Sequence, residues 1–184
     1  MLMIANRKIC VLGLGSMGMG VALSLLDRQF EVVGFDVNKN AMKGLEEAGG
    51  TVKNSVKSAV ENCIAVIVLV VNDKQVEDVL FGIDGAVEGL SSGAVVIQSS
   101  TIPVAYAKEC GNRLLDQGFE MIDAPVSGGA AGARSANLSI MASGPDSAFE
   151  KVADIMDAIS GKIYRLGSEY GIGSTVKTVN QLLA

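Results

Sequence analysis

Val11-Leu12-Gly13-Leu14-Gly15-Ser16-Met17-Gly18-Met19-Gly20 is the stretch that decides the fold of this chain. It follows a short apolar run that is typical of a strand, and it leads into apolar residues at helical spacing. A glycine-rich turn between a strand and a helix lets a dinucleotide pyrophosphate approach the backbone, and the helix N-terminus offers it free N–H groups. The motif therefore predicts a dinucleotide site, which the rest of the chain has to support. The expected contacts are Gly13, Leu14, Gly15, Ser16, Met17 and Gly18.

The composition indicates one full domain with a sizeable core. Of 184 residues, 49% are hydrophobic, the formal net charge is −5, and no cluster of Lys and Arg stands out. This balance argues against nucleic acid or an anionic membrane as a partner. The longest apolar run, Ile64 to Val71, is too short to cross a bilayer, and residues 1–8 lack the apolar core of a signal peptide. We therefore expect a cytoplasmic protein.

The chain contains no histidine, which narrows its possible chemistry. A histidine base and a histidine-ligated metal are excluded, so acid–base chemistry falls to Lys, Tyr, Asp, Glu or Cys. The three cysteines, Cys10, Cys63 and Cys110, lack the spacing of metal ligands and are expected to be buried, reduced thiols. No metal site is predicted.

Strand-like and helix-like segments alternate along most of the chain, which predicts an α/β fold with a doubly wound, mostly parallel sheet of the Rossmann type. The pattern changes at residues 123–137, which are predicted to be a small-residue loop. A last helix is expected from about Ser168, with an apolar stripe that includes Val179 and Leu182. The strands are expected at residues 8–12, 31–35, 51–52, 64–71, 94–98, 119–122, 138–142 and 162–166, and the other helices at 16–28, 39–48, 55–61, 74–80, 103–117 and 146–159.

Asp36 supports the cofactor interpretation of the glycine turn. It ends the second predicted strand, 18 residues after Gly18, where a carboxylate can bind a ribose 2′-hydroxyl and would repel a 2′-phosphate. Lys39 is the only basic residue that follows closely, so NAD is predicted rather than NADP. Ligands of open α/β sheets lie beyond the carboxyl ends of the strands. The residues expected there, on the nicotinamide side of the cofactor, are Val71, Asn72, Ser100 and Thr101.

Four motifs together resemble the β-hydroxyacid dehydrogenases, the family that includes 3-hydroxyisobutyrate dehydrogenase. The glycine turn is similar to the start of that family, and Asp123-Ala-Pro-Val-Ser-Gly-Gly129 is similar to its substrate-binding signature. Leu138-Ser-Ile-Met141 resembles the strand after the substrate loop, and Gly171-Ile-Gly-Ser-Thr-Val-Lys177-Thr-Val-Asn180 resembles the catalytic signature. Four motifs in the same order, spanning essentially the whole chain, are far more specific than any one of them.

The resemblance implies oxidation of a small 3-hydroxyacid to the 3-oxoacid, with NAD as the hydride acceptor. It assigns the substrate carboxylate to Ser127, Gly128 and Gly129, whose hydroxyl and backbone N–H groups suit an anion. It makes Lys177 the general acid/base and Asn180 a substrate contact one helical turn away. A lysine needs burial or a neighbouring positive charge for this role, because its ordinary pKa is about 10.4.

Differences from related groups of enzymes narrow the resemblance to the hydroxyacid dehydrogenases. Decarboxylating 6-phosphogluconate dehydrogenases have a histidine where Asn180 stands, and imine reductases and catalytically silent members lack the lysine. Residues 130–137 and Asp36 resemble the branch that acts on four-carbon sugar acids, which includes L-threonate dehydrogenase.

The length of the chain is its main departure from the family. Family members continue into an all-helical domain through which they oligomerise, so we expect an NAD-binding domain at residues 1–167 and the truncated start of that helical domain at 168–184. The alternative is a non-catalytic dinucleotide-binding or oligomerisation module, or a fragment that binds NAD without turnover.

Overall fold

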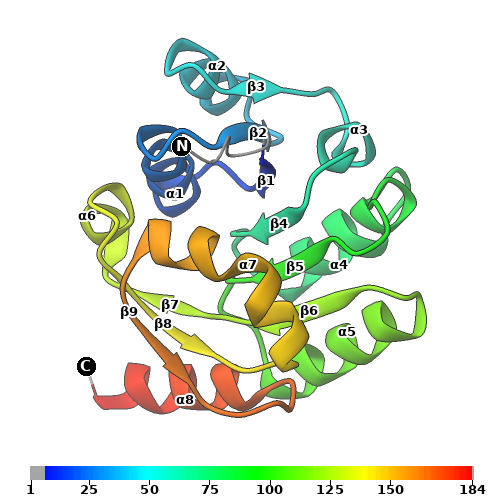
Figure 1. Ribbon diagram of the computed structural model, residues 1–184, viewed down its shortest axis with the longest axis vertical. Coiled ribbons are helices and arrows are strands. Elements are labelled where there is room, and N and C mark those ends of the chain that lie inside the picture. The colour runs from blue at the N-terminus through cyan, green and yellow to red at the C-terminus, as the bar shows by residue number, and fades with distance from the viewer. Residues whose placement is uncertain (1–6, 184) are drawn as a thin grey trace.

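The computed structural model describes residues 7–183 and contains a six-stranded parallel sheet (Figure 1). The strand order is β3-β2-β1-β4-β5-β6, so the chain reverses direction across the sheet between β1 and β4. This is the switch point at which open α/β sheets bind ligands. The predicted doubly wound Rossmann fold is confirmed. The strands are β1 (Lys8–Leu12), β2 (Glu31–Phe35), β3 (Thr51–Val52), β4 (Ala65–Val68), β5 (Val95–Gln98) and β6 (Glu120–Asp123).

Helices cover both faces of this sheet, and the alternation of side chains along β1 shows why (Figure 1). Ile9 and Val11 belong to the core under the first group of helices, whereas Cys10 and Leu12 belong to the core under the second. Both faces of β1 are therefore apolar, as expected for a buried parallel strand. The first group is α1 (Ser16–Asp27), α2 (Lys39–Glu47) and α7 (Asp146–Ile159), and the second is α3 (Val56–Val60), α4 (Asp73–Phe81), the 3-10 helix η1 (Ala86–Glu88) and α5 (Val104–Asp116).

A second, three-stranded sheet lies beside the first and includes part of the segment that was predicted to be a loop. In this sheet β7 (Val126–Ser127) pairs antiparallel with β8 (Leu138–Ala142), which pairs parallel with β9 (Ser160–Arg165). Residues 123–137 are thus not a simple loop, because they contain β7 and the short helix α6 (Gly129–Arg134). The prediction was wrong here because α6 buries only Ala133 along its six residues, and so shows no apolar periodicity.

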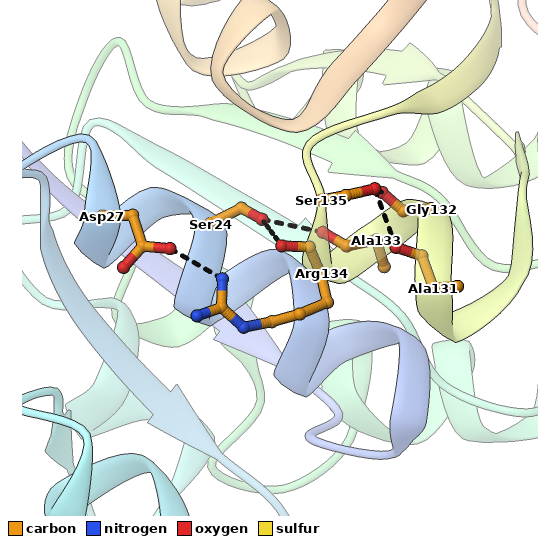
Figure 2. Close-up of polar contacts among 7 residues, drawn as sticks. All are labelled: Ser24, Asp27, Ala131, Gly132, Ala133, Arg134 and Ser135. Carbon is orange, nitrogen blue, oxygen red and sulfur yellow. Dashed lines mark hydrogen bonds and ion pairs between the residues drawn. The ribbon is translucent and has the colours of Figure 1, made fainter.

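The helix α6 forms where it packs against α1 (Figure 2). A side chain on Gly20 would bring its Cβ to 2.8 Å from Ala133 Cβ, so only glycine permits this approach. The buried Ser24 hydroxyl donates to the carbonyl oxygen of Ala133 at 2.8 Å, and Arg134 forms an ion pair with Asp27 at 2.6 Å. The segment that precedes α6 is therefore fixed relative to the helix that follows the glycine turn.

Two element boundaries differ from the predictions in ways that affect the site. The strand β4 ends at Val68, so the predicted residues up to Val71 leave the sheet. The last helix, α8, spans Ile172–Leu183 and begins four residues later than predicted, after Gly171 at φ +90°.

Two further predictions concern the burial of the cysteines and the presence of membrane-spanning or signal segments. Cys10, Cys63 and Cys110 are buried free thiols, as predicted. Within residues 7–183, no helix combines the length and apolar character needed to cross a membrane. Residues 1–6, which carry most of the signal-peptide argument, lie outside the described residues.

Candidate active site

A cavity of about 460 Å³ lies beyond the carboxyl ends of β1, β4, β5 and β6. Its lining comes from residues 15–18, 69–71, 99–101 and 126–129, and from Lys177 of α8. Segments that are far apart in sequence therefore meet around one space. The cavity therefore brings together the glycine turn, the nicotinamide-side segments after β4 and β5, the Ser127–Gly129 loop and the lysine of the catalytic motif.

The glycine turn presents an uncapped helix N-terminus to this cavity. Gly15 precedes α1 in an extended conformation, no side chain caps the helix, and its first turn contains no acidic residue. A Cβ atom on Gly18 would overlap with the carbonyl oxygen of Gly13, so the tight turn requires glycine at position 18. Free N–H groups at the positive end of a helix dipole favour an anion such as a pyrophosphate.

A second cavity, of about 390 Å³, lies on the other side of the turn and shares Gly15 and residues 69–71 with the first. Asp36 lines it, and each carboxylate oxygen accepts one backbone bond, from Leu14 N–H at 2.6 Å and from Asn38 N–H at 2.7 Å. These bonds hold the carboxylate in place and leave acceptor capacity for a ribose hydroxyl. The exposed side chains of Val37 and Val71 add apolar walls suited to a flat heterocycle.

Leu14 and Gly13 contribute mainly through the backbone. The side chain of Leu14 is buried in the core, and its N–H group already binds Asp36. Gly13 lines the second cavity and donates its N–H to the carbonyl oxygen of Phe35 at 2.9 Å.

The predicted nicotinamide-side residues are placed in different ways. Ser100 and Thr101 line the first cavity, where Ser100 Oγ accepts a bond from Val70 N–H at 2.9 Å and so joins the loops after β4 and β5. Asn72 instead caps α4, accepting from Gln75 N–H at 2.9 Å, and lines neither of these two cavities. Ser99, which precedes Ser100 just after β5, also lines the first cavity. Its hydroxyl is the one buried side-chain polar atom of the described residues that has no hydrogen-bond partner.

The Ser127–Gly129 loop offers small residues and a hydroxyl group to the first cavity. Gly128 and Gly129 have φ angles of +132° and +63°, which favour glycine, and all three residues of the loop line the cavity. A hydroxyl group and backbone N–H groups without bulky side chains suit a carboxylate. The loop joins β7 to α6, so the packing of α6 on α1 sets its distance from the glycine turn.

Within residues 7–183, Lys177 is the only charged residue that lines the first cavity. It is 8% exposed, and none of the ion pairs among the described residues involves it. Burial lowers the pKa of its ammonium below the ordinary value of a lysine. Asn180, one turn further along α8, is exposed and does not line the cavity, so its contact with substrate stays a prediction.

Known proteins resemble this chain closely. L-threonate dehydrogenase of Cupriavidus necator is 46% identical over 179 residues, which are 97% of this chain and 60% of that protein. NAD-dependent L-serine dehydrogenase of Pseudomonas aeruginosa is 34% identical over 97% of this chain and 60% of its own length. The solved structure of 3-hydroxyisobutyrate dehydrogenase from Salmonella typhimurium superimposes with a TM-score of 0.92 at 38% identity, covering 97% of this chain and 62% of that one.

These relatives confirm the resemblance that the four motifs predicted, and the chain spans about 60% of the length of the curated relatives. Residues 8–167 match the family described as the NAD binding domain of 6-phosphogluconate dehydrogenase. That match contains the glycine turn, Asp36 and the Ser127–Gly129 loop, and it ends before Lys177. The chain therefore belongs to the family of the NAD binding domain of 6-phosphogluconate dehydrogenase.

Proposed function

We propose that this chain is the NAD-binding part of a dehydrogenase that oxidises a small 3-hydroxyacid to the 3-oxoacid. The observation that carries the proposal is that Lys177 shares one cavity with the uncapped N-terminus of α1 and with the Ser127–Gly129 loop. Around one space, the N-terminus of α1 can then bind a cofactor diphosphate, the Ser127–Gly129 loop a substrate carboxylate, and Lys177 a proton.

The residues divide the work according to their chemistry. The bound cofactor supplies an oxidised nicotinamide that accepts the hydride. Ser127 and the N–H groups of Gly128 and Gly129 bind the carboxylate and set the orientation of the substrate. Lys177, in its neutral form, takes the proton of the hydroxyl group that is being oxidised, and Asn180 assists the orientation. The lowered pKa of Lys177 supports this role, because it raises the fraction of neutral amine near neutral pH.

We propose a four-carbon sugar acid such as L-threonate as the substrate. The support is that the five relatives named L-threonate dehydrogenase are 42% to 49% identical to this chain, against 34% for the relative named L-serine dehydrogenase. L-threonate carries hydroxyl groups on C2, C3 and C4, so the position of the new carbonyl group also tests the choice of C3.

We also propose that residues 168–184 begin a second, all-helical domain and that the full-length protein is a cytoplasmic homo-oligomer. The support is the exposed apolar surface of α8, where Val179, Leu182 and Leu183 are 51%, 81% and 84% exposed. Side chains of this kind are normally covered by another element.

The test is NAD reduction by the full-length protein with L-threonate, 3-hydroxyisobutyrate and glycerate, with product analysis by NMR. We expect turnover of L-threonate, and we expect Lys177→Ala to lower kcat by about 10²- to 10⁴-fold while NAD affinity stays nearly unchanged. Lys53→Ala, at an exposed position, is the matched control and should leave kcat as it is. NAD binding without turnover of any small hydroxyacid would favour the non-catalytic module, and a 2-oxo product would contradict oxidation at C3.

A further inference from the structure

Asp123 opens the motif that contains the Ser127–Gly129 loop, yet it does not line the cavity. Its carboxylate is fully buried at the end of β6. Oδ2 accepts the N–H groups of Gly171 at 3.0 Å and Ser174 at 2.8 Å, and Oδ1 accepts the Ser174 hydroxyl at 2.7 Å. The donors come from Gly171, just before α8, and from Ser174 in its first turn, about 50 residues further along the chain. Asp123 therefore contacts the start of α8 rather than the cavity.

Ser143 completes the contact from the adjacent chain segment. The backbones of Asp123 and Ser143 are bridged by two hydrogen bonds of 2.9 Å, and Ser143 Oγ accepts the N–H of Gly173 at 3.0 Å. A side chain on Gly173 would overlap with the carbonyl oxygens of Asp123 and Met141, so the first turn of α8 lies directly on these backbones. Tertiary contacts thus satisfy N–H groups that a local N-cap residue satisfies in most helices.

The rest of α8 has little support from the described residues. Gly173, Ser174 and Lys177 are its buried positions, and every residue from 178 to 183 is exposed. Figure 1 shows the helix running along one end of the molecule beside β8. Lys177 follows the clamped turn immediately, so a change in the direction of that turn changes where its ammonium lies in the cavity.

A carboxylate suits the clamp better than a neutral side chain of the same shape. Two of the three partners are backbone N–H groups, which can only donate, and a carboxylate accepts from both of them and from the Ser174 hydroxyl in charge-assisted bonds. The positive end of the helix dipole also favours a negative charge at this position. Burial raises the pKa of Asp123, and the bonds from Ser174 and Gly171 act in the opposite direction.

We infer that Asp123 is a positioning residue: its buried carboxylate clamps the first turn of α8 and thereby holds Lys177 in the cavity. The inference rests on the proposed function of Lys177 as the acid/base. It also gives the two signature motifs separate tasks, since the loop from Ser127 to Gly129 lines the cavity while Asp123 ties it to the helix that carries the lysine.

Amide hydrogen exchange on the chain described here tests the clamp without any turnover. In Asp123→Asn we expect amides in residues 172–177 to exchange at least about tenfold faster, because the bonds from the Gly171 and Ser174 N–H groups lose their charge assistance. Amides of β1 and β4 should keep their rates. Asp146→Asn is the control, because Asp146 also lies in the first turn of a helix but is exposed and pairs only with Arg165. Unchanged protection of residues 172–177 would overturn the inference.

A milder variant keeps the test decisive if Asp123→Asn does not fold. Ser174→Ala removes only the hydroxyl bond to Oδ1, so we expect a several-fold, local increase in exchange at the start of α8. Equal acceleration in β1 and β4 would indicate a general loss of stability and would also overturn the inference.

Kinetics of the full-length protein then separate positioning from cofactor binding. Asp123→Asn and Ser174→Ala should lower kcat while the Kd for NAD stays within about twofold. A fall in NAD affinity with unchanged kcat would contradict the positioning role. If exchange responds as expected and the unmutated full-length enzyme shows no turnover, the proposed function fails while the clamp stands.

Discussion

The helices α1 and α8 both contribute residues to the same cavity, but the N–H groups at their N-termini differ in what they bind. No side chain caps α1, and its first turn lines the cavity. At the start of α8, Asp123 and Ser143 accept the N–H groups of Gly171, Gly173 and Ser174, so these three are already bound within the protein. A helix N-terminus attracts an anion in either case. At α8 the protein supplies that anion itself, whereas at α1 it leaves the place to a ligand.

This difference separates a binding element from a supporting element. A free helix N-terminus can bind an anion only if the anion can reach it. The glycines in the turn before α1 permit this approach. An occupied N-terminus fixes the helix rigidly and lets it carry a side chain, here Lys177, into the cavity. In the proposed function α1 binds the cofactor and α8 carries the proton acceptor, and residues of both helices line the same cavity.

The largest effect is expected from Gly18→Ala, which breaks the start of α1. Its Cβ would overlap with the carbonyl oxygen of Gly13, so the turn must open, at a cost of about 3 kcal/mol or more. We expect a clear fall in the melting temperature and no NAD binding detectable by calorimetry.

Gly15→Ala is the matched control for that change. A Cβ on Gly15 meets no protein atom within 4 Å, so the melting temperature should stay nearly unchanged. NAD affinity should still fall, because the methyl group occupies the cavity beside the uncapped helix. Normal NAD affinity in Gly15→Ala would mean that the pyrophosphate does not approach this turn.

A medium effect is expected from Asp36→Asn, which alters the anion beside the turn of α1. The amide keeps one acceptor for the ribose but loses the charge, so NAD should bind about tenfold more weakly. NADP should lose less, because a carboxylate no longer repels its 2′-phosphate, and the preference for NAD should narrow. Equal affinities of the unmutated chain for NAD and NADP, measured by calorimetry, would refute the role of Asp36.

The smallest effect is expected from Lys177→Met, which removes the charge that α8 carries. Burial lowers the pKa of Lys177, so at neutral pH the folded state bears the cost of a buried ammonium. Between that lowered pKa and about 10.4, the unfolded chain binds more protons than the folded one, so stability of the unmutated chain rises with pH. Lys177→Met should therefore melt a few degrees higher at pH 7, with the advantage shrinking towards pH 10.

Thermal denaturation at several pH values checks this last expectation. Lys53→Met, at an exposed position, should change the melting temperature little at any of them. A difference between Lys177→Met and the unmutated chain that does not vary with pH would show that the ammonium carries no such cost.

Much of the cofactor half of the site could be predicted from the sequence, because its signals are local. The strand, the glycine turn and the helix start follow one another directly, and Asp36 stands at a spacing fixed by one strand–helix–strand unit. The alternation of strands and helices likewise predicted a parallel sheet, because apolar period and segment length are properties of short windows. Asn72 shows the limit of such reasoning, since its side chain caps α4.

The sequence by itself determined the glycine turn and the doubly wound sheet, and through family resemblance it predicted a role for Lys177. Only the tertiary structure decided why Gly20 has no side chain, that α6 forms on α1, and that Asp123 holds the helix of the lysine. The physical reason is sequence distance. A turn or a strand is selected by neighbours along the chain, whereas a tertiary cap joins a donor and an acceptor about 50 residues apart and leaves no periodic trace in the sequence.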